Sequence, residues 1–197
     1  MRTMLRLAVA GAVLFACSGE LAQPQPATRP IDPKKSSVVV HVYKTGFFSA
    51  FAHNHEIDAP VDSGQVSADA GQASVDIHVD ARKLQVADPE ASAGTRAQIQ
   101  KTMLGPQVLD ADRYPEIHFR STTVESRGTN SWSVNGTLEL HGQKHPVTAI
   151  VTLKDGLYAG SVVLKQTDFG ITPVAVAGGT VKVKDEVKVE FQIALSQ

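Results

Sequence analysis

The stretch VDIHVD at residues 75–80 alternates apolar and polar side chains at every position. Successive side chains of a β-strand point to opposite faces, so Val75, Ile77 and Val79 would share one face and the polar residues the other. Such a strand suits a sheet that covers a core on one side and meets water on the other. The stretch predicts an antiparallel, all-β fold.

The same period of two continues on both sides of this stretch. It recurs at residues 38–43, 116–120, 132–141, 147–153, 158–164 and 187–195. The turn signals between strands are Asp62-Ser63-Gly64, Ala70-Gly71, Arg127-Gly128, Lys154-Asp155-Gly156 and Lys184-Asp185. Most are short enough for hairpins. A sheet of seven or eight such strands can hide its apolar faces in a sandwich or a closed barrel, and the pattern leaves both open.

Residues 88–109 break the rhythm. Asp88 can cap a helix, and Ile99 and Met103 are spaced one helical turn apart. Gly105-Pro106 would end the helix. We predict a helical insertion near residues 88–109 that covers one end of the barrel.

The N-terminus is typical of an export signal. Arg2 and Arg6 precede an apolar run at residues 7–15 that is too short to span a membrane. We predict a signal peptide at residues 1–17, a disordered Pro-rich tether at 18–36 and one domain at 37–197. The mature protein would be periplasmic. Cleavage before Cys17 would give a lipoprotein tethered to the membrane, whereas cleavage after Ser18 or Gly19 would give a soluble form.

Composition and motifs exclude several classes of function. The chain has 197 residues, 19 basic and 20 acidic, with a net charge of −1, which argues against a nucleic-acid partner. Cys17 is the only cysteine, so the fold has no intrachain disulfide. The sequence has no nucleophile elbow, zinc-protease motif or phosphate-binding glycine loop, and we expect neither catalysis nor a cofactor.

Two histidines form a candidate binding site. His53 and His55 lie two residues apart, on one side of a strand, near the aromatic Phe51. They could contact a polar head group or bind a metal, although a zinc site wants at least three ligands. The remaining candidates occupy polar strand faces and are expected to be solvated: His41, His78, His118 and His141.

Three ordered segments carry a resemblance to a known family. They are DRYPEIHFRS at residues 112–121, NGTLELHGQKHPVT at 135–148 and KQTDFGI at 165–171. Together they resemble the YceI-like family, exported lipocalin-like proteins that bind polyisoprenoid lipids. The likeness spans about residues 37–197. The first third departs from the family pattern, because FAHNHEI stands at residues 51–57.

The resemblance implies an eight-stranded antiparallel lipocalin-like β-barrel around an elongated hydrophobic cavity. From the pattern alone, the inward rows could equally be a filled core. By the resemblance, the cavity wall comprises Val75, Ile77, Phe119, Trp132, Leu138, Leu140, Phe169, Val189, Phe191 and Ile193. His53 and His55, which lie where the chain departs from the family pattern, are candidate head-group contacts on their own chemistry.

The leading hypothesis is a noncatalytic periplasmic carrier of an isoprenoid quinone or a similar lipid. One alternative is a metal-binding or acid-base enzyme that uses His53 and His55 on the same barrel. Another is a protein-interaction module tethered through Cys17. A homodimer is compatible with each of these hypotheses.

Overall fold

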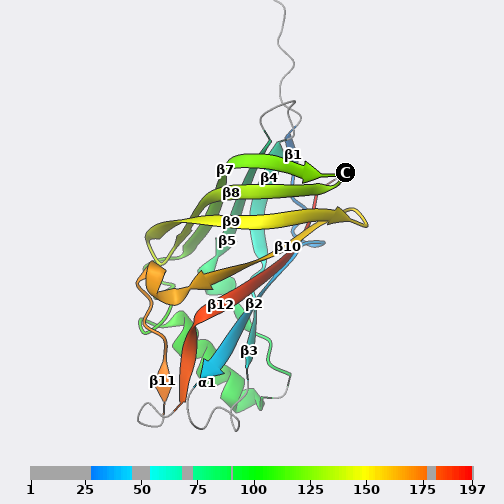
Figure 1. The fold of residues 1–197 in the computed structure, drawn as a ribbon. Coiled ribbons are helices and arrows are strands. Elements are labelled where there is room, and N and C mark those ends of the chain that lie inside the picture. The colour runs from blue at the N-terminus through cyan, green and yellow to red at the C-terminus, as the bar shows by residue number, and fades with distance from the viewer. Residues whose placement is uncertain (1–27, 46–53, 68–72, 90, 177–180, 197) are drawn as a thin grey trace, which may run out of the picture.

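The computed structural model describes residues 28–45, 54–67, 73–89, 91–176 and 181–196. β-Strands are its main elements (Figure 1). The predicted signal peptide and Cys17 lie outside these residues. The strands are β1 Thr28–Pro30, β2 Ser37–Thr45, β3 His55–Asp58, β4 Val61–Ser67, β5 Ser74–Asp80, β6 Gln85–Val86, β7 Glu116–Gly128, β8 Ser131–Leu140, β9 Gln143–Lys154, β10 Leu157–Lys165, β11 Ala175–Val176 and β12 Val181–Ala194. A helix, α1 Ala93–Leu104, and two 3-10 helices, η2 Ala81–Lys83 and η3 Gln166–Phe169, complete the described elements.

All strand pairs within the described residues are antiparallel and belong to one sheet. Its order is β1-β4-β5-β7-β8-β9-β10-β12-β2-β3-β6, with β11 beside β12. Eight of these strands have seven residues or more. The sheet is strongly curled, so that its two ends approach each other (Figure 1). The predicted class, an all-β antiparallel barrel with one helix, is confirmed.

The two ends of the sheet are brought together by the chain itself. β3 pairs with β2, β4 pairs with β5, and only Ala59 and Pro60 separate β3 from β4. A second link forms at Ile31, which bridges to Leu195 and whose N–H donates to the Gly64 carbonyl at 2.9 Å. These links return the sheet upon itself and enclose its apolar face.

The barrel begins earlier than predicted. The predicted tether at 18–36 includes residues 28–36, but Thr28–Pro30 form β1 and Ile31 is buried. Four prolines between residues 24 and 33 favoured the wrong assignment. Proline is tolerated here because β1 lies at the end of the sheet and has one neighbour, β4.

Two predicted turn signals lie inside strands instead. The segments Asp62-Ser63-Gly64 and Lys184-Asp185 fall within β4 and β12, where the register shifts, as at a β-bulge. The prediction at Lys154-Asp155-Gly156 is confirmed: Asp155 and Gly156 have φ of 53° and 81°, as a two-residue hairpin turn requires. Ala70-Gly71 lies outside the described residues.

Helix α1 covers one end of the barrel, as predicted, but begins later (Figure 1). Its N-cap is Ser92, whose hydroxyl accepts from the Thr95 N–H at 3.1 Å. Asp88, the predicted cap, lies before the helix and makes other contacts. At the C-terminal end the Gly105 N–H donates to the Lys101 carbonyl. No helix in the described ranges is long and apolar enough to cross a membrane.

Candidate ligand-binding cavity

The inner face of the curled sheet encloses a cavity of about 840 Å³. This lies within the range of about 300–1,000 Å³ that is usual for small-molecule sites. Its wall is almost wholly apolar. Nine of the ten predicted wall residues line it: Val75, Ile77, Phe119, Trp132, Leu138, Leu140, Val189, Phe191 and Ile193. That these residues contact a ligand stays a prediction.

Two inward-facing glycines make room for aromatic rings of the wall. A Cβ atom on Gly136 would lie 2.5 Å from Cζ of Phe119, and one on Gly160 would lie 2.6 Å from Cζ of Phe191. Any larger residue would displace the ring. Because Gly136 and Gly160 have no side chain, the rings of Phe119 and Phe191 can pack close to the strands that carry these glycines.

Phe169, the tenth predicted wall residue, lies in the core and not at the cavity. It is 2% exposed and packs in the main buried cluster with residues such as Ile57 and Met103. The His145 ring meets it edge-on at 5.1 Å, and His141 Nδ1–H donates to its carbonyl at 3.0 Å. Phe169 ends η3, where the period of two no longer determines direction, so the assignment to the wall was wrong.

Asp88 and His55 form a polar pair at the cavity wall. Asp88 is 3% exposed, and both side chains line the cavity. His55 Nδ1 lies 2.5 Å from Asp88 Oδ2, and the Glu56 N–H donates to Asp88 Oδ1 at 2.7 Å. A buried carboxylate is tolerated only when its oxygens have partners. Here the histidine and the backbone of β3 supply them.

Several other polar lining residues lie at the same end as this pair, whereas Ser67 lines the opposite end. Thr95, Gln98 and Thr102 come from α1, and Lys44 and Lys182 come from paired segments of β2 and β12. The far end is lined mainly by apolar and aromatic groups, among them Trp132 and Tyr158. The cavity is therefore amphipathic along its length, with its polar end beside α1 (Figure 1).

The predicted pair of histidines is only partly described. His53 lies outside the described residues, so a joint site with His55 stays a prediction. Asp88, which completes the observed pair, was not predicted as a site residue. The local sequence pattern favours Asp88 as a helix cap. Only the pairing of β3 with β6 brings Asp88 close to His55.

The outer histidines are less solvated than predicted. His41 lies outside the barrel, with Nε2 3.1 Å from Glu190 Oε2. His78 and His118 lie on the outer face of β5 and β7 and contact carboxylates. His141 is not on a strand face but in the turn between β8 and β9, with φ of 52°.

A family model described as a YceI-like domain matches residues 30–195. The chain belongs to the YceI family. The resemblance seen in the three sequence segments is thereby confirmed, and the match begins within β1, in agreement with the earlier start of the barrel.

Curated relatives of this YceI chain match it in part. A UPF0312 protein of Pseudomonas putida strain W619 is 39% identical over 85 residues, 38% of this chain and 44% of the relative. A UPF0312 protein of Vibrio cholerae strain O395 is 29% identical over 133 residues, 62% of this chain and 65% of the relative. The matches thus cover less than two thirds of these relatives' own length.

Solved structures show the same YceI fold. Burkholderia cenocepacia BcnA superposes with a TM-score of 0.67 at 22% identity, over 85% of this chain and 99% of that chain. A Campylobacter jejuni YceI protein superposes with a TM-score of 0.50 at 14% identity, over 79% of this chain and 85% of that chain. At these identities the likeness establishes the fold alone.

Proposed function

We propose that this YceI protein is a noncatalytic periplasmic carrier that holds an isoprenoid quinone, or a similar long-chain amphiphile, inside its barrel. The observation that carries the proposal is the cavity of about 840 Å³, apolar along its wall and polar at the α1 end. The sequence resemblance to polyisoprenoid-binding members of the family supports the same ligand class.

An apolar tail can supply the affinity. Each buried methylene is worth roughly 0.8 kcal/mol, so ten contribute about 8 kcal/mol before the cost of association. The wall offers branched and aromatic side chains, such as Val75, Ile77 and Phe119, and these suit a branched isoprenoid chain. The tail would lie toward Trp132 and Tyr158, where the lining is apolar.

The polar end would take the head group. Asp88 contacts Nδ1 of His55, and we propose that Nε2 meets an oxygen of the ligand. Thr95, Gln98 and Thr102 of α1 offer further hydrogen-bonding groups at the same end. An amphiphile with a carbonyl or hydroxyl head group matches this arrangement better than a plain hydrocarbon does.

Export would place the carrier between two membranes. The signal peptide at residues 1–17 would direct it to the periplasm, and lipidation of Cys17 would tether it to a membrane that contains the ligand. Cleavage after Ser18 or Gly19 would leave it free to diffuse. Retention in the membrane fraction, lost in Cys17→Ser, distinguishes these two forms.

Trp132 offers a direct test of binding. It is the only tryptophan of the chain and lines the cavity, so a bound quinone should quench its fluorescence. We expect saturable quenching by an isoprenoid quinone added to the purified protein. Quenching that rises linearly without saturation would contradict the proposal.

A matched pair of variants locates the ligand. Ala149 lines the cavity, whereas its neighbour Ile150 is 47% exposed on the outer face. Ala149→Phe should fill part of the cavity and weaken quinone binding by about tenfold or more, while Ile150→Phe should leave it unchanged. Thermal unfolding of both variants checks that the barrel is intact. Equal affinity in the two variants would exclude the cavity as the binding site.

A further inference from the structure

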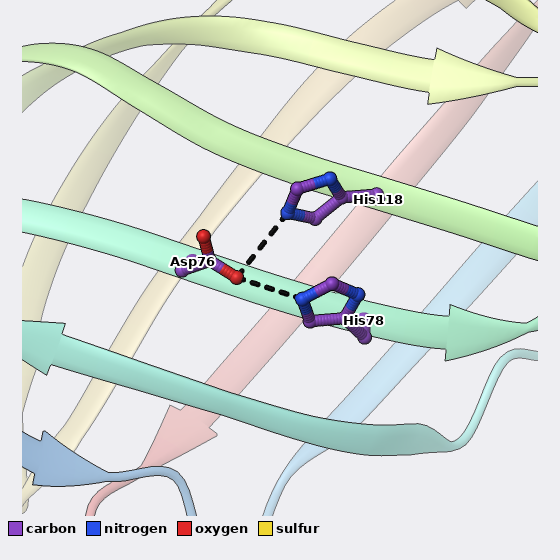
Figure 2. Close-up of side chains that lie close together, drawn as sticks. All are labelled: Asp76, His78 and His118. Atoms are coloured by element: carbon purple, nitrogen blue, oxygen red, sulfur yellow. Dashed lines mark hydrogen bonds and ion pairs between the residues drawn. The ribbon is translucent and has the colours of Figure 1, made fainter.

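Three side chains that can bind a metal meet on the outer face of the barrel. Asp76 and His78 project from β5, and His118 projects from the neighbouring β7, all toward one point (Figure 2). The register places His78 directly opposite His118. Asp76 and His78 are two residues apart on β5, so Asp76 lies on the same face as the two histidines.

The distances within this cluster suit a small cation. Asp76 Oδ1 lies 2.9 Å from His78 Nε2 and 3.2 Å from His118 Nε2. All three ligand atoms lie within 4.8 Å of one another. In a tetrahedral site with bonds of about 2.0–2.1 Å, neighbouring ligand atoms are separated by roughly 3.3 Å. The three ligand atoms are therefore close to the spacing that an ion requires, and rotation of one imidazole would turn its nitrogen toward the ion.

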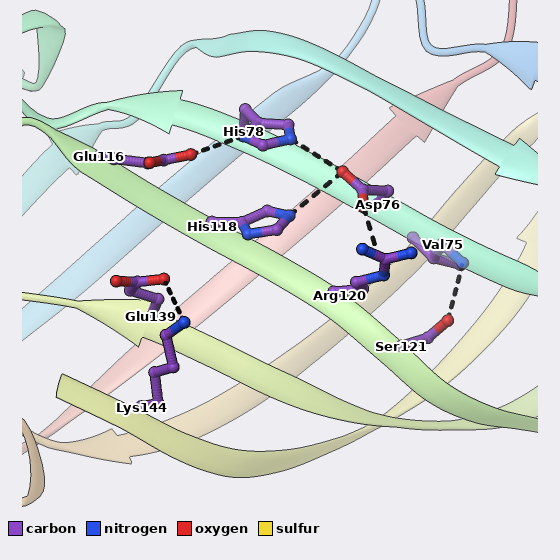
Figure 3. A network of polar contacts seen from close by, with 9 residues as sticks. All are labelled: Val75, Asp76, His78, Glu116, His118, Arg120, Ser121, Glu139 and Lys144. Atoms are coloured by element: carbon purple, nitrogen blue, oxygen red, sulfur yellow. Dashed lines mark hydrogen bonds and ion pairs between the residues drawn. The ribbon is translucent and has the colours of Figure 1, made fainter. Parts of the chain in front are cut away.

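The surroundings orient His78, and the two imidazoles lie against each other. Their rings stack with centroids 4.1 Å apart and planes inclined by 9°, and because a metal lies close to the plane of each ring that binds it, one ring must rotate when the ion enters. His78 Nδ1 lies 3.0 Å from Glu116 Oε1 (Figure 3). A carboxylate on the far nitrogen of a histidine orients the ring and leaves the other nitrogen to face a metal.

The remaining neighbours fix Asp76 and the strands that carry the cluster. Arg120 Nε lies 3.8 Å from Asp76 Oδ2, the oxygen that faces away from the histidines (Figure 3). The Val75 N–H donates to Ser121 Oγ at 2.8 Å and ties β5 to β7. The ligands therefore lie on paired strands, which hold their spacing. Arg120 opposes a cation by its charge, but it is 76% exposed and therefore largely screened.

We propose that Asp76, His78 and His118 bind one divalent transition-metal ion, of the class of Zn²⁺, on the outer wall of the barrel. His78 Nε2, His118 Nε2 and one oxygen of Asp76 are the ligands, and water completes the coordination. Glu116 is a positioning residue, because it acts through His78. Imidazole and carboxylate suit Zn²⁺ and its late first-row neighbours, and not Ca²⁺, which prefers oxygen alone.

This site is independent of the lipid cavity. The ligands belong to the polar face of β5 and β7, whereas Val75, Ile77 and Phe119 of the same strands line the cavity. The side chains of Asp76, His78 and His118 are 22%, 37% and 22% exposed, so an ion and its water can reach them from solvent. Failure of quinone binding would leave the metal proposal standing, and the reverse also holds.

The first experiment is a calorimetric titration of Zn²⁺ into untagged, chelator-treated protein. We expect one ion per chain, with affinity at least about tenfold weaker in His118→Ala, since even the loss of an outer partner costs about 10–100-fold. His41→Ala is the matched control, because His41 also lies outside the barrel beside carboxylates. Zn²⁺ should also raise the unfolding temperature of the wild type but not of His118→Ala.

Two further variants separate a metal site from a network of hydrogen bonds. Glu116→Gln should weaken Zn²⁺ binding by about 10–100-fold and leave the metal-free unfolding temperature nearly unchanged. Arg120→Gln should strengthen binding by roughly two- to fivefold, because it removes a nearby positive charge. The proposal is overturned if the wild type does not bind Zn²⁺, or if His118→Ala and His41→Ala bind it equally well.

Discussion

The two faces of β5 and β7 differ in what they require from the sequence. On the inner face, Val75, Ile77 and Phe119 need only be apolar and of suitable size to line the cavity. On the outer face, Asp76 and His118 meet only because the two strands pair in one particular register. The inner face therefore tolerates the exchange of one apolar side chain for another better than a shift in strand register. The outer cluster depends on both the identity of its side chains and the register.

The largest difference between the faces should appear in stability. Phe119→Ala removes a ring that packs against Gly136 and should lower the free energy of unfolding by about 3 kcal/mol. His118→Ala, its neighbour on the outer face, should cost less than about 1 kcal/mol without metal, because it loses a partly exposed ion pair. Urea denaturation of the two variants measures both. Equal losses would mean that the inner face is not the stabilising one.

A smaller difference should separate the inner and outer histidines. His55→Ala removes the proposed head-group contact and should weaken quinone binding by roughly fivefold to tenfold, as expected for one hydrogen bond. His41→Ala, on the outer face of β2, should not change quinone affinity. Quenching of Trp132 in both variants gives the comparison. A loss in His41→Ala alone would place the ligand outside the barrel.

The smallest effect is expected at Asp80, the last residue of β5. The hydrogen bond from the Arg82 side chain lowers the pKa of this carboxyl from 3.8 to about 2. Because the folded-state pKa is lowered, its stabilisation is fully present above about pH 4 and is lost as the pH falls through 2. The stability difference between wild type and Asp80→Asn should be constant at neutral pH and shrink below pH 4. A difference that grows toward pH 2 would contradict this assignment.

Much of the fold follows from local sequence. Alternation predicts the long strands and which residues face inward, because parity along a strand needs no knowledge of its partners. The three segments from Asp112 to Ile171 indicate the barrel, and α1 follows from spacing and a terminal glycine. β1 was missed because prolines normally exclude strands, and an end strand with one neighbour is the exception.

Site residues could be predicted only where the alternation of side chains along a strand determines which face they occupy. Alternation gives the inward direction of nine cavity residues, and the family resemblance indicates that they line a cavity and not a filled core. Phe169 belongs to a 3-10 helix, where alternation does not determine direction. Asp88 suits a helix cap by local pattern, and its contact with His55 arises from pairing across 33 residues. The cluster of Asp76, His78 and His118 requires the register of β5 with β7, which no short motif encodes.

The central claim is that the barrel holds one long-chain amphiphile. Solvent extraction of the protein purified from its native envelope, followed by mass spectrometry, tests it most directly. We predict an isoprenoid quinone or a similar lipid at about one molecule per chain, depleted in Ala149→Phe and retained in Ile150→Phe. A lipid-free extract from the wild type that also fails to take up added quinone would contradict the account.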